Sequence, residues 1–151
     1  MTILRPLLLA AMLAAPAWPV TAADTPSAPA APAAVDLSKA RALIAQKDWN
    51  AAIAELDRLA RRDAKNADVQ NLLGYSYRNA GQVDKAFTAY HNALRLDPNH
   101  KGAHEYIGIA YLLSKQPDKA KEHLARLKVI CGGETCEEYQ DLAKAIAAYT
   151  P

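Results

Sequence analysis

The two cysteines of the chain, Cys131 and Cys136, carry its most reactive side chains, and four residues separate them. A pair at short spacing can act as a redox-active dithiol or can form a structural disulfide. Redox motifs of the thioredoxin type have two residues between their cysteines and lie in an alternating strand and helix pattern, and neither feature occurs here. The spacing therefore favours a structural disulfide, provided that the chain folds in an oxidising compartment.

The four histidines are, by residue type, possible metal ligands. His100 and His104 are four residues apart, whereas His91 and His123 lie elsewhere in the sequence. A metal site on one helix needs both members of such a pair within that helix and a third ligand nearby. Because His100 is predicted to lie in the turn before its helix, we interpret the histidines as surface residues and expect no metal or other cofactor.

The sequence contains no recognisable enzyme motif. It has no glycine-rich phosphate-binding loop, no serine at a strand-to-helix elbow, and no pair of carboxylates that spacing alone would place in a cleft. Its 18 basic and 16 acidic residues nearly balance, so neither nucleic acid nor an anionic membrane surface is predicted as the main partner. We therefore expect a protein without catalytic activity.

The N-terminal part of the chain predicts export. Residues 1–22 contain one basic residue, Arg5, then the apolar run Leu7–Ala15 and a small-residue end, a pattern typical of a cleaved signal peptide. The apolar run is shorter than the ~20 residues of a membrane-spanning helix, and no nearby cysteine is available to carry a lipid. No stable membrane anchor is therefore expected after cleavage. Residues 23–34 form an alanine- and proline-rich tether.

The stretch 67–100 predicts one helix-turn-helix unit. Small and apolar residues recur on one face of each of two predicted helices, at Leu73, Gly74, Tyr77, Ala86, Tyr90 and Ala93. The small residues let the helix backbones approach closely, and the larger ones fill the remaining space. Pro98 ends the second helix, because proline disfavours the helical conformation of the residue before it and lacks an amide donor.

This pattern and its 34-residue length resemble the tetratricopeptide repeat, a helix-turn-helix unit of the same period. Five of its positions recur 34 residues later, at Ile107, Gly108, Tyr111, Ala120 and Leu124, and a degenerate copy precedes it. The resemblance implies an all-α fold, a helix-turn-helix repeat solenoid. Its units would be a degenerate first repeat at 35–66, the second at 67–100, the third at 101–134, and a capping helix at 135–151.

Helices are predicted at Asp36–Gln46, Trp49–Arg62, Asp68–Asn79, Val83–Leu96, Ala103–Leu113, Asp118–Ile130 and Glu137–Tyr149. The predicted disulfide would join the end of the third unit to the capping helix. Gly132 and Gly133 are expected to end the helix before them in a left-handed turn. Thr135 and Glu138 are expected to form a capping box that begins the last helix. The bond would then hold the apolar face of that helix against the stack.

In the family that the repeats resemble, the first helices of the units line a concave groove that binds partners. The resemblance places these residues in that groove: Arg41, Ile44, Asn71, Tyr75, Arg78, Asn79, Glu105, Ile109 and Leu112. The polar members suit a peptide backbone or carboxylate, and the apolar members suit an extended peptide or an amphipathic helix. The clustered lysines and asparagines with which some relatives bind a C-terminal carboxylate are not reproduced. Alternatively, Tyr75 and Leu112 pack against the last helix.

The sequence thus predicts an exported, non-enzymatic module that binds a protein or peptide in its groove. A bacterial periplasm is the expected location, because the repeat family is common there and the chain has no N-glycosylation sequon. Two alternatives remain. The domain could self-associate into a homo-oligomer through its end repeats, or it could be a thiol-disulfide enzyme with an exposed, acidified cysteine.

Overall fold

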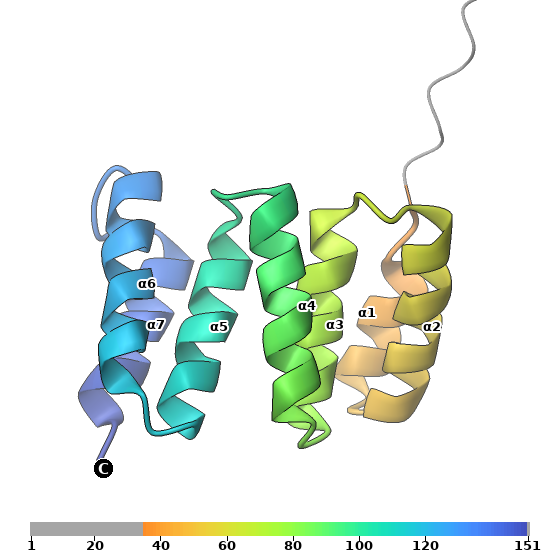
Figure 1. Cartoon of the computed structure of the whole chain (residues 1–151), viewed down its shortest axis with the longest axis horizontal. Helices are drawn as coiled ribbons and strands as arrows, with labels where there is room; N and C mark the ends of the chain where they lie inside the picture. Colours follow the sequence, from red (N-terminus) through yellow and green to blue (C-terminus); the bar gives the residue numbers. More distant parts are fainter. Residues whose placement is uncertain (1–34, 151) are drawn as a thin grey trace, which may run out of the picture. The chain divides into compact units, whose positions relative to one another are not determined.

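The computed structural model describes residues 35–150, and the predicted signal peptide and tether lie outside the described residues. In the described part every regular element is a helix (Figure 1). The helices are α1 (Ser38–Ala45), α2 (Trp49–Arg62), α3 (Ala67–Asn79), α4 (Val83–Leu96), α5 (Lys101–Leu113), α6 (Pro117–Ile130) and α7 (Glu137–Ala148). The predicted all-α fold is therefore confirmed. None of these helices is long and apolar enough to cross a membrane.

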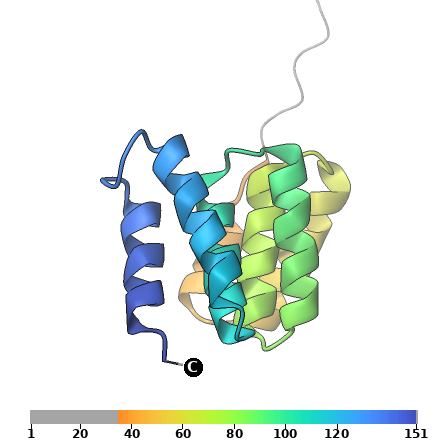
Figure 2. The ribbon, with the colours of Figure 1, turned by 60° about the vertical axis from the view of Figure 1, so that its left-hand side comes forward.

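Consecutive helices pack in pairs, α1 with α2, α3 with α4, and α5 with α6, and the pairs stack one after another (Figure 1). Contacts between α2 and α3, and between α4 and α5, join successive pairs. Further contacts join the first helices of the later pairs: α3 contacts α5, and α5 contacts α7. Figure 2 shows α7 beside α6 at the end of the stack. The last helix therefore occupies the place of the first helix of a further unit.

The turn inside each helix pair has the same backbone conformation. Lys47, Gly81 and Lys115 lie 34 residues apart in sequence, and their φ angles are 58°, 77° and 58°. In each turn the next amide donates a hydrogen bond to a carbonyl five residues earlier, as Gln82 does to Tyr77 at 2.8 Å. The 34-residue period is thus present in the backbone as well as in the side chains.

Glycines in the first helices let neighbouring helices approach closely. A Cβ atom at Gly74 would lie 2.5 Å from the ring of Tyr90, and one at Gly108 would lie 2.6 Å from the side chain of Leu142. Both Tyr90 and Leu142 are fully buried. The close approach at Gly108 seats α7 on α5, so this glycine positions the last helix.

Local hydrogen bonds explain why two helices begin elsewhere than the sequence predicted. The α5 helix begins at Lys101 instead of Ala103, because Nδ1 of His100 accepts a hydrogen bond of 3.1 Å from the Ala103 amide. The α1 helix begins at Ser38 instead of Asp36, because the Asp36 carboxylate accepts a hydrogen bond of 2.9 Å from the Ser38 amide. The other boundaries differ from the predicted ones by one residue at most.

Two glycines end α6 in a Schellman motif. The amide of Gly132 donates to the carbonyl of Val129 at 3.2 Å, and the amide of Gly133 donates to that of Lys128 at 2.9 Å. Gly132 has a φ of 67°, a left-handed conformation that glycine adopts without steric cost. The chain therefore reverses here and leads directly into α7.

Candidate functional site

Two predicted groove residues, Tyr75 and Arg78, lie together in a cluster of aromatic side chains. Tyr75 of α3 packs against Trp49 of α2, with ring centroids 6.1 Å apart, and against Tyr106 of α5, with centroids 5.0 Å apart. The guanidinium carbon of Arg78 lies 5.2 Å from the ring centroid of Tyr75 and 5.7 Å from that of Tyr106. Such cation–π contacts contribute about 0.5–1 kcal/mol each at partly exposed positions. We call these four side chains the aromatic cluster.

The polar atoms of the aromatic cluster are incompletely paired. Among the described residues Arg78 forms no ion pair, and its Nε atom is buried without a hydrogen-bond partner. The hydroxyl of Tyr90 is likewise buried without a partner in this part of the chain. Burial raises the pKa of Tyr106 to about 12, so its hydroxyl keeps its proton. These atoms therefore carry a cost of unpaired burial that the described residues do not offset.

A second feature lies beside this cluster, between α5 and α7. A pocket of about 190 Å³ is lined by Gly102, Glu105, Tyr106, Glu137, Glu138 and Asp141, and we call it the acidic pocket. Glu105 is only 8% exposed and, within residues 35–150, forms no hydrogen bond or ion pair. Burial raises the pKa of Glu105 to about 7, and the charges of Asp141 and Glu138 add to this effect, while Arg78 opposes it.

Glu55 shows how this protein pairs a carboxylate of similar burial. It is 7% exposed, accepts a hydrogen bond of 3.3 Å from Nε of Arg58, and lies 3.2 Å from Nζ of Lys39. The hydrogen bond from Arg58 is the main cause that lowers the pKa of Glu55 to about 2. Since Lys39 belongs to α1 and Glu55 to α2, this network joins two helices. Glu105 makes no comparable bond.

Asn71 lies at the edge of the acidic pocket. It is 6% exposed, and its Oδ1 atom has no hydrogen-bond partner among the described residues. Its Nδ2 atom would be 3.1 Å from a Cβ at Gly102, so it packs directly on the start of α5. Gly102 and Glu138 also line a polar pocket of about 580 Å³ at the N-terminal ends of α3 and α5. The acidic pocket therefore continues into a longer polar surface.

Ile109 and Leu112 lie farther along α5, in an apolar region next to the end of α7. Together with Leu113 and Tyr149 they line a pocket of about 410 Å³. Leu112 thus lies beside the last helix, as the alternative interpretation expected. Tyr75 does not, since it packs against Trp49 and Tyr106. The last helix forms one wall of the candidate groove.

The remaining predicted groove residues are not brought to the centre. Arg41 is exposed, and Ile44 packs against the core cluster of the first repeat. Asn79 ends α3 and uses its Nδ2 atom to donate a hydrogen bond of 2.8 Å to the carbonyl of Tyr75. The structure therefore concentrates the candidate site on α3, α5 and α7.

Sequence reasoning missed several residues that shape this surface. They are Trp49 and Tyr106 of the aromatic cluster and Glu137, Glu138 and Asp141 of the acidic pocket. Tyr106 was detectable, because it is an aromatic residue adjacent in sequence to a groove position. The three acidic residues were not detectable, because α7 lacks the residue types of the repeat pattern. Leu142 stands at the position where the earlier units have Gly74 and Gly108. They also resemble an ordinary acidic first turn of a helix.

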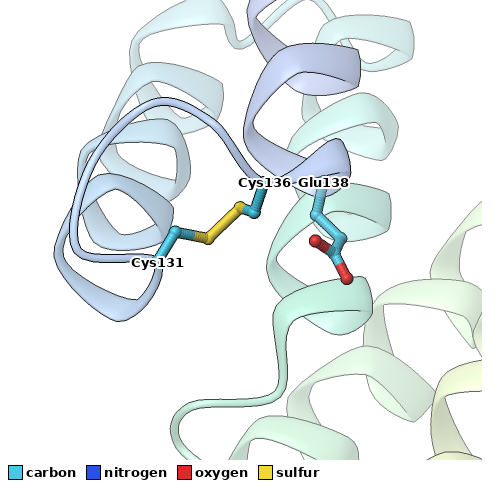
Figure 3. A group of neighbouring side chains, drawn as sticks. All are labelled: Cys131, Cys136 and Glu138. Carbon is cyan, nitrogen blue, oxygen red and sulfur yellow. A yellow bond between two sulfur atoms is a disulfide. The ribbon is translucent and has the colours of Figure 1, made fainter.

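Figure 3 shows the disulfide between Cys131 and Cys136, with Glu138 close by. The bond joins the end of α6 to the start of α7, and the two Cα atoms are 6.0 Å apart. The sulfur atoms and the Glu138 carboxylate are near enough to suggest a metal site, but metals bind the thiolate, which a disulfide lacks. The predicted capping box is wrong. Cys136, not Thr135, is the N-cap residue, and no side chain caps α7, since Thr135 lies one residue too early.

The interpretation of the histidines as surface residues is wrong for His104, which is 7% exposed. Its Nδ1 atom is 2.9 Å from Nδ1 of His123, and its Nε2 atom is 3.1 Å from the carbonyl oxygen of Pro98. If Nε2 donates to Pro98, Nδ1 of His104 is the acceptor for the proton of His123. Burial lowers the pKa of both rings, that of His123 to about 4, so the pair is neutral. Sequence spacing gave no sign of this contact between α5 and α6.

Comparison with known protein families matches residues 67–100 to the tetratricopeptide repeat. Among curated proteins, the DnaJ protein P58IPK homologs B and A of Oryza sativa subsp. japonica are each 33% identical to this chain over 99 residues. The match covers 65% of this chain and 21% of each relative. The chain thus corresponds to about a fifth of the length of these relatives.

Solved structures with similar folds cover most of the described helices. MamA from Desulfovibrio magneticus RS-1 has a TM-score of 0.60 at 22% identity, over 65% of this chain and 55% of MamA. The translocator chaperone SycD of Yersinia enterocolitica has a TM-score of 0.64 at 16% identity, over 74% and 83%. The first TPR of Spaghetti, bound to an HSP90 peptide, has a TM-score of 0.62 at 17% identity, over 73% and 89%. At these identities the likeness shows the fold.

The stacked helix pairs define the chain as a helical-repeat solenoid, a class whose extended surfaces bind partners. The match at residues 67–100 is to the tetratricopeptide-repeat family, and the described helices share the helical-repeat fold of the structural neighbours. Members of this family are generally scaffolds for protein interaction without catalytic activity.

Proposed function

We propose that this chain is an adaptor that binds a peptide or helix of another protein on the face formed by α3, α5 and α7. The observation that carries the proposal is the set of unpaired buried groups on this face. Asn71 and Arg78 have buried polar atoms without a partner among the described residues, and Glu105, 8% exposed, forms no hydrogen bond or ion pair with them. Arg78 also lies beside the rings of Tyr75 and Tyr106. A buried polar group without a partner costs about 1–3 kcal/mol, so these residues are candidates for contact with a bound partner.

The proposal extends to the location, an oxidising compartment outside the cytoplasm and most simply a bacterial periplasm. The predicted signal peptide supports export, and the disulfide suits such a compartment. The similar repeat domain of Spaghetti holds an HSP90 peptide, which supports a peptide as one form of the partner.

The test is a crosslinking capture from the native cell envelope. We compare the wild type, a Tyr75→Ala, Arg78→Ala double variant, and an Arg95→Ala control on the exposed surface of α4. The wild type and the control are expected to capture the same defined protein, and the double variant is expected to lose it while keeping its helical circular dichroism spectrum. Capture of the same proteins by all three variants would refute the proposed face.

Self-association is a second candidate, because the apolar pocket at the end of α5 contains Leu113, which is 64% exposed. The similar chaperone SycD is a dimer in its solved structure. Sedimentation of the purified protein separates the two candidates. A concentration-dependent dimer that Leu113→Asp dissociates would favour self-association, and a monomer at all concentrations would favour the adaptor. A thiol-disulfide enzyme has the least support, since four residues separate the cysteines and the described elements around them are helices only.

A further inference from the structure

The acidic pocket is a preformed feature with two rigid walls. Glu105 and Tyr106 come from α5, and Glu137, Glu138 and Asp141 come from the first turns of α7. The α7 helix is fixed at two points, by the disulfide at its start and by the contact of Leu142 with Gly108 in its middle. The position of the helix turns that carry the pocket's carboxyl groups is therefore set by the fold.

Glu105 is the group that marks this pocket as a site. Its side chain is more than nine-tenths buried and lines the pocket, yet within the described residues no cation or hydrogen-bond donor pairs with it. Glu55 has nearly the same exposure and is paired with both Arg58 and Lys39. An unpaired buried carboxylate is unfavourable. A cation from outside the chain would therefore stabilise the ionised form of Glu105.

We infer that the acidic pocket binds the side chain of a lysine or arginine in the partner, with Glu105 as the principal anion. This inference rests on the proposed function, because it names the chemistry of the peptide. A volume of about 190 Å³ holds the end of one long side chain. The ring of Tyr106 forms a wall against which the apolar stem of such a side chain packs, leaving its charged end at the carboxylates.

The surroundings favour a basic side chain over a free divalent cation. The positive charge of Arg78 acts on Glu105, and it would oppose the two charges of a divalent ion more than the single charge of a side chain. Arg78 also places a cation next to the anionic pocket, so the charge changes sign along the face. Gly102 and Glu138 continue the surface into the polar pocket of about 580 Å³, which gives an extended peptide a path beyond its basic residue.

The experiment selects peptides from a phage-displayed random library on the purified full chain with its disulfide intact. The selected peptides are synthesised with their basic residue and with a neutral replacement, citrulline for arginine or acetyl-lysine for lysine. Their affinities are then measured for the wild type, the Tyr75→Ala, Arg78→Ala double variant and Glu105→Gln. Glu122→Gln, which changes an exposed glutamate of α6, is the matched control. Calcium chloride is titrated separately as the divalent-cation probe.

The expected result is a lysine or arginine at one fixed position in the selected peptides. Neutralising either that residue or Glu105 should weaken binding about tenfold or more, the effect of losing one charge-assisted hydrogen bond. The two changes together should cost no more than either one alone, and Glu122→Gln should change nothing.

Three outcomes would contradict the inference. If peptides bind and Tyr75→Ala, Arg78→Ala abolishes binding while Glu105→Gln has no effect, the inference fails and the proposed function stands. If no peptide is selected, or if all variants bind alike, both fail. Calcium binding that Glu105→Gln abolishes, without any preference for basic peptides, would show a metal site instead.

Discussion

Glu55 and Glu105 lie in different regions of the same stack of helices and are almost equally buried, at 7% and 8% exposure. Glu55 lies at the α1–α2 contact, where two cations pair with it, and its pKa falls to about 2. Glu105 lies between α5 and α7, where burial and neighbouring carboxylates raise its pKa to about 7. Equal burial therefore produces opposite electrostatics, depending on the charged groups beside each carboxyl group.

The difference separates residues that hold the fold together from residues that reduce its stability. Between α1 and α2 the charges of Lys39 and Glu55 are complementary, so their ion pair supports the contact between the helices. At α5–α7 the contact depends on apolar packing and on the disulfide, and the carboxyl groups of the acidic pocket oppose it. Residues that reduce the stability of the fold in this way are candidates for binding.

Removing the apolar anchor of α7 should have the largest effect. Leu142→Ala deletes a fully buried side chain that fills the space over Gly108, so the free energy of unfolding should fall by about 2–4 kcal/mol. It should also loosen the pocket and move the pKa of Glu105 toward 4.5, measurable by carboxyl NMR titration. Leu56→Ala, at a fully buried position of α2, is the control. If both variants shift this pKa equally, the pocket does not depend on α7.

Removing the disulfide should have an intermediate effect on stability, confined to the α7 end of the stack. The Cys131→Ser, Cys136→Ser double variant loses about 2 kcal/mol by the chain-entropy argument for a short loop. Hydrogen exchange should become faster in α7 and remain unchanged in α1 and α2. Uniformly faster exchange throughout the described helices would mean that the disulfide stabilises the whole stack and not only its last helix.

Neutralising Glu105 or Glu55 should give the smallest changes in the free energy of unfolding, and the two changes should have opposite signs. The folded-state pKa of Glu105 lies above its unfolded value, so ionisation of Glu105 destabilises the fold as pH rises from 4.5 through 7. Glu105→Gln should therefore stabilise the protein at pH 8, by about 1 kcal/mol after allowance for solvent screening.

For Glu55 the pKa is lowered, so its contribution is present above pH 4.5 and is lost as pH falls toward 2. Glu55→Gln should therefore destabilise the protein at pH 8. Thermal unfolding of both variants at pH 4 and pH 8 measures the two signs. Equal signs at pH 8 would remove the distinction between the two regions.

The repeat pattern predicted the packing better than it predicted the candidate site. Gly74, Tyr90 and Gly108 were readable because close helix packing restricts these positions to particular sizes, and sizes recur with the period. The neighbours of Glu105 in the acidic pocket could not be predicted, because most belong to α7. In this helix the repeat pattern is lost, since Leu142 replaces the glycine of the earlier units. The His104–His123 contact was missed for a related reason: it depends on the relative rotation of two helices, which spacing alone does not define.

The identical turns at Lys47, Gly81 and Lys115 have a consequence for how such a chain changes over generations. Since each joint between first and second helices has the same backbone geometry, a 34-residue segment can be duplicated or deleted in the gene without creating a new kind of joint. Two of the three turns hold a lysine in a conformation that glycine adopts more easily, so the geometry is retained even where the residue is not ideal. The number of helix pairs can thus change in steps of one unit, whereas the disulfide and the acidic pocket both depend on the single helix α7.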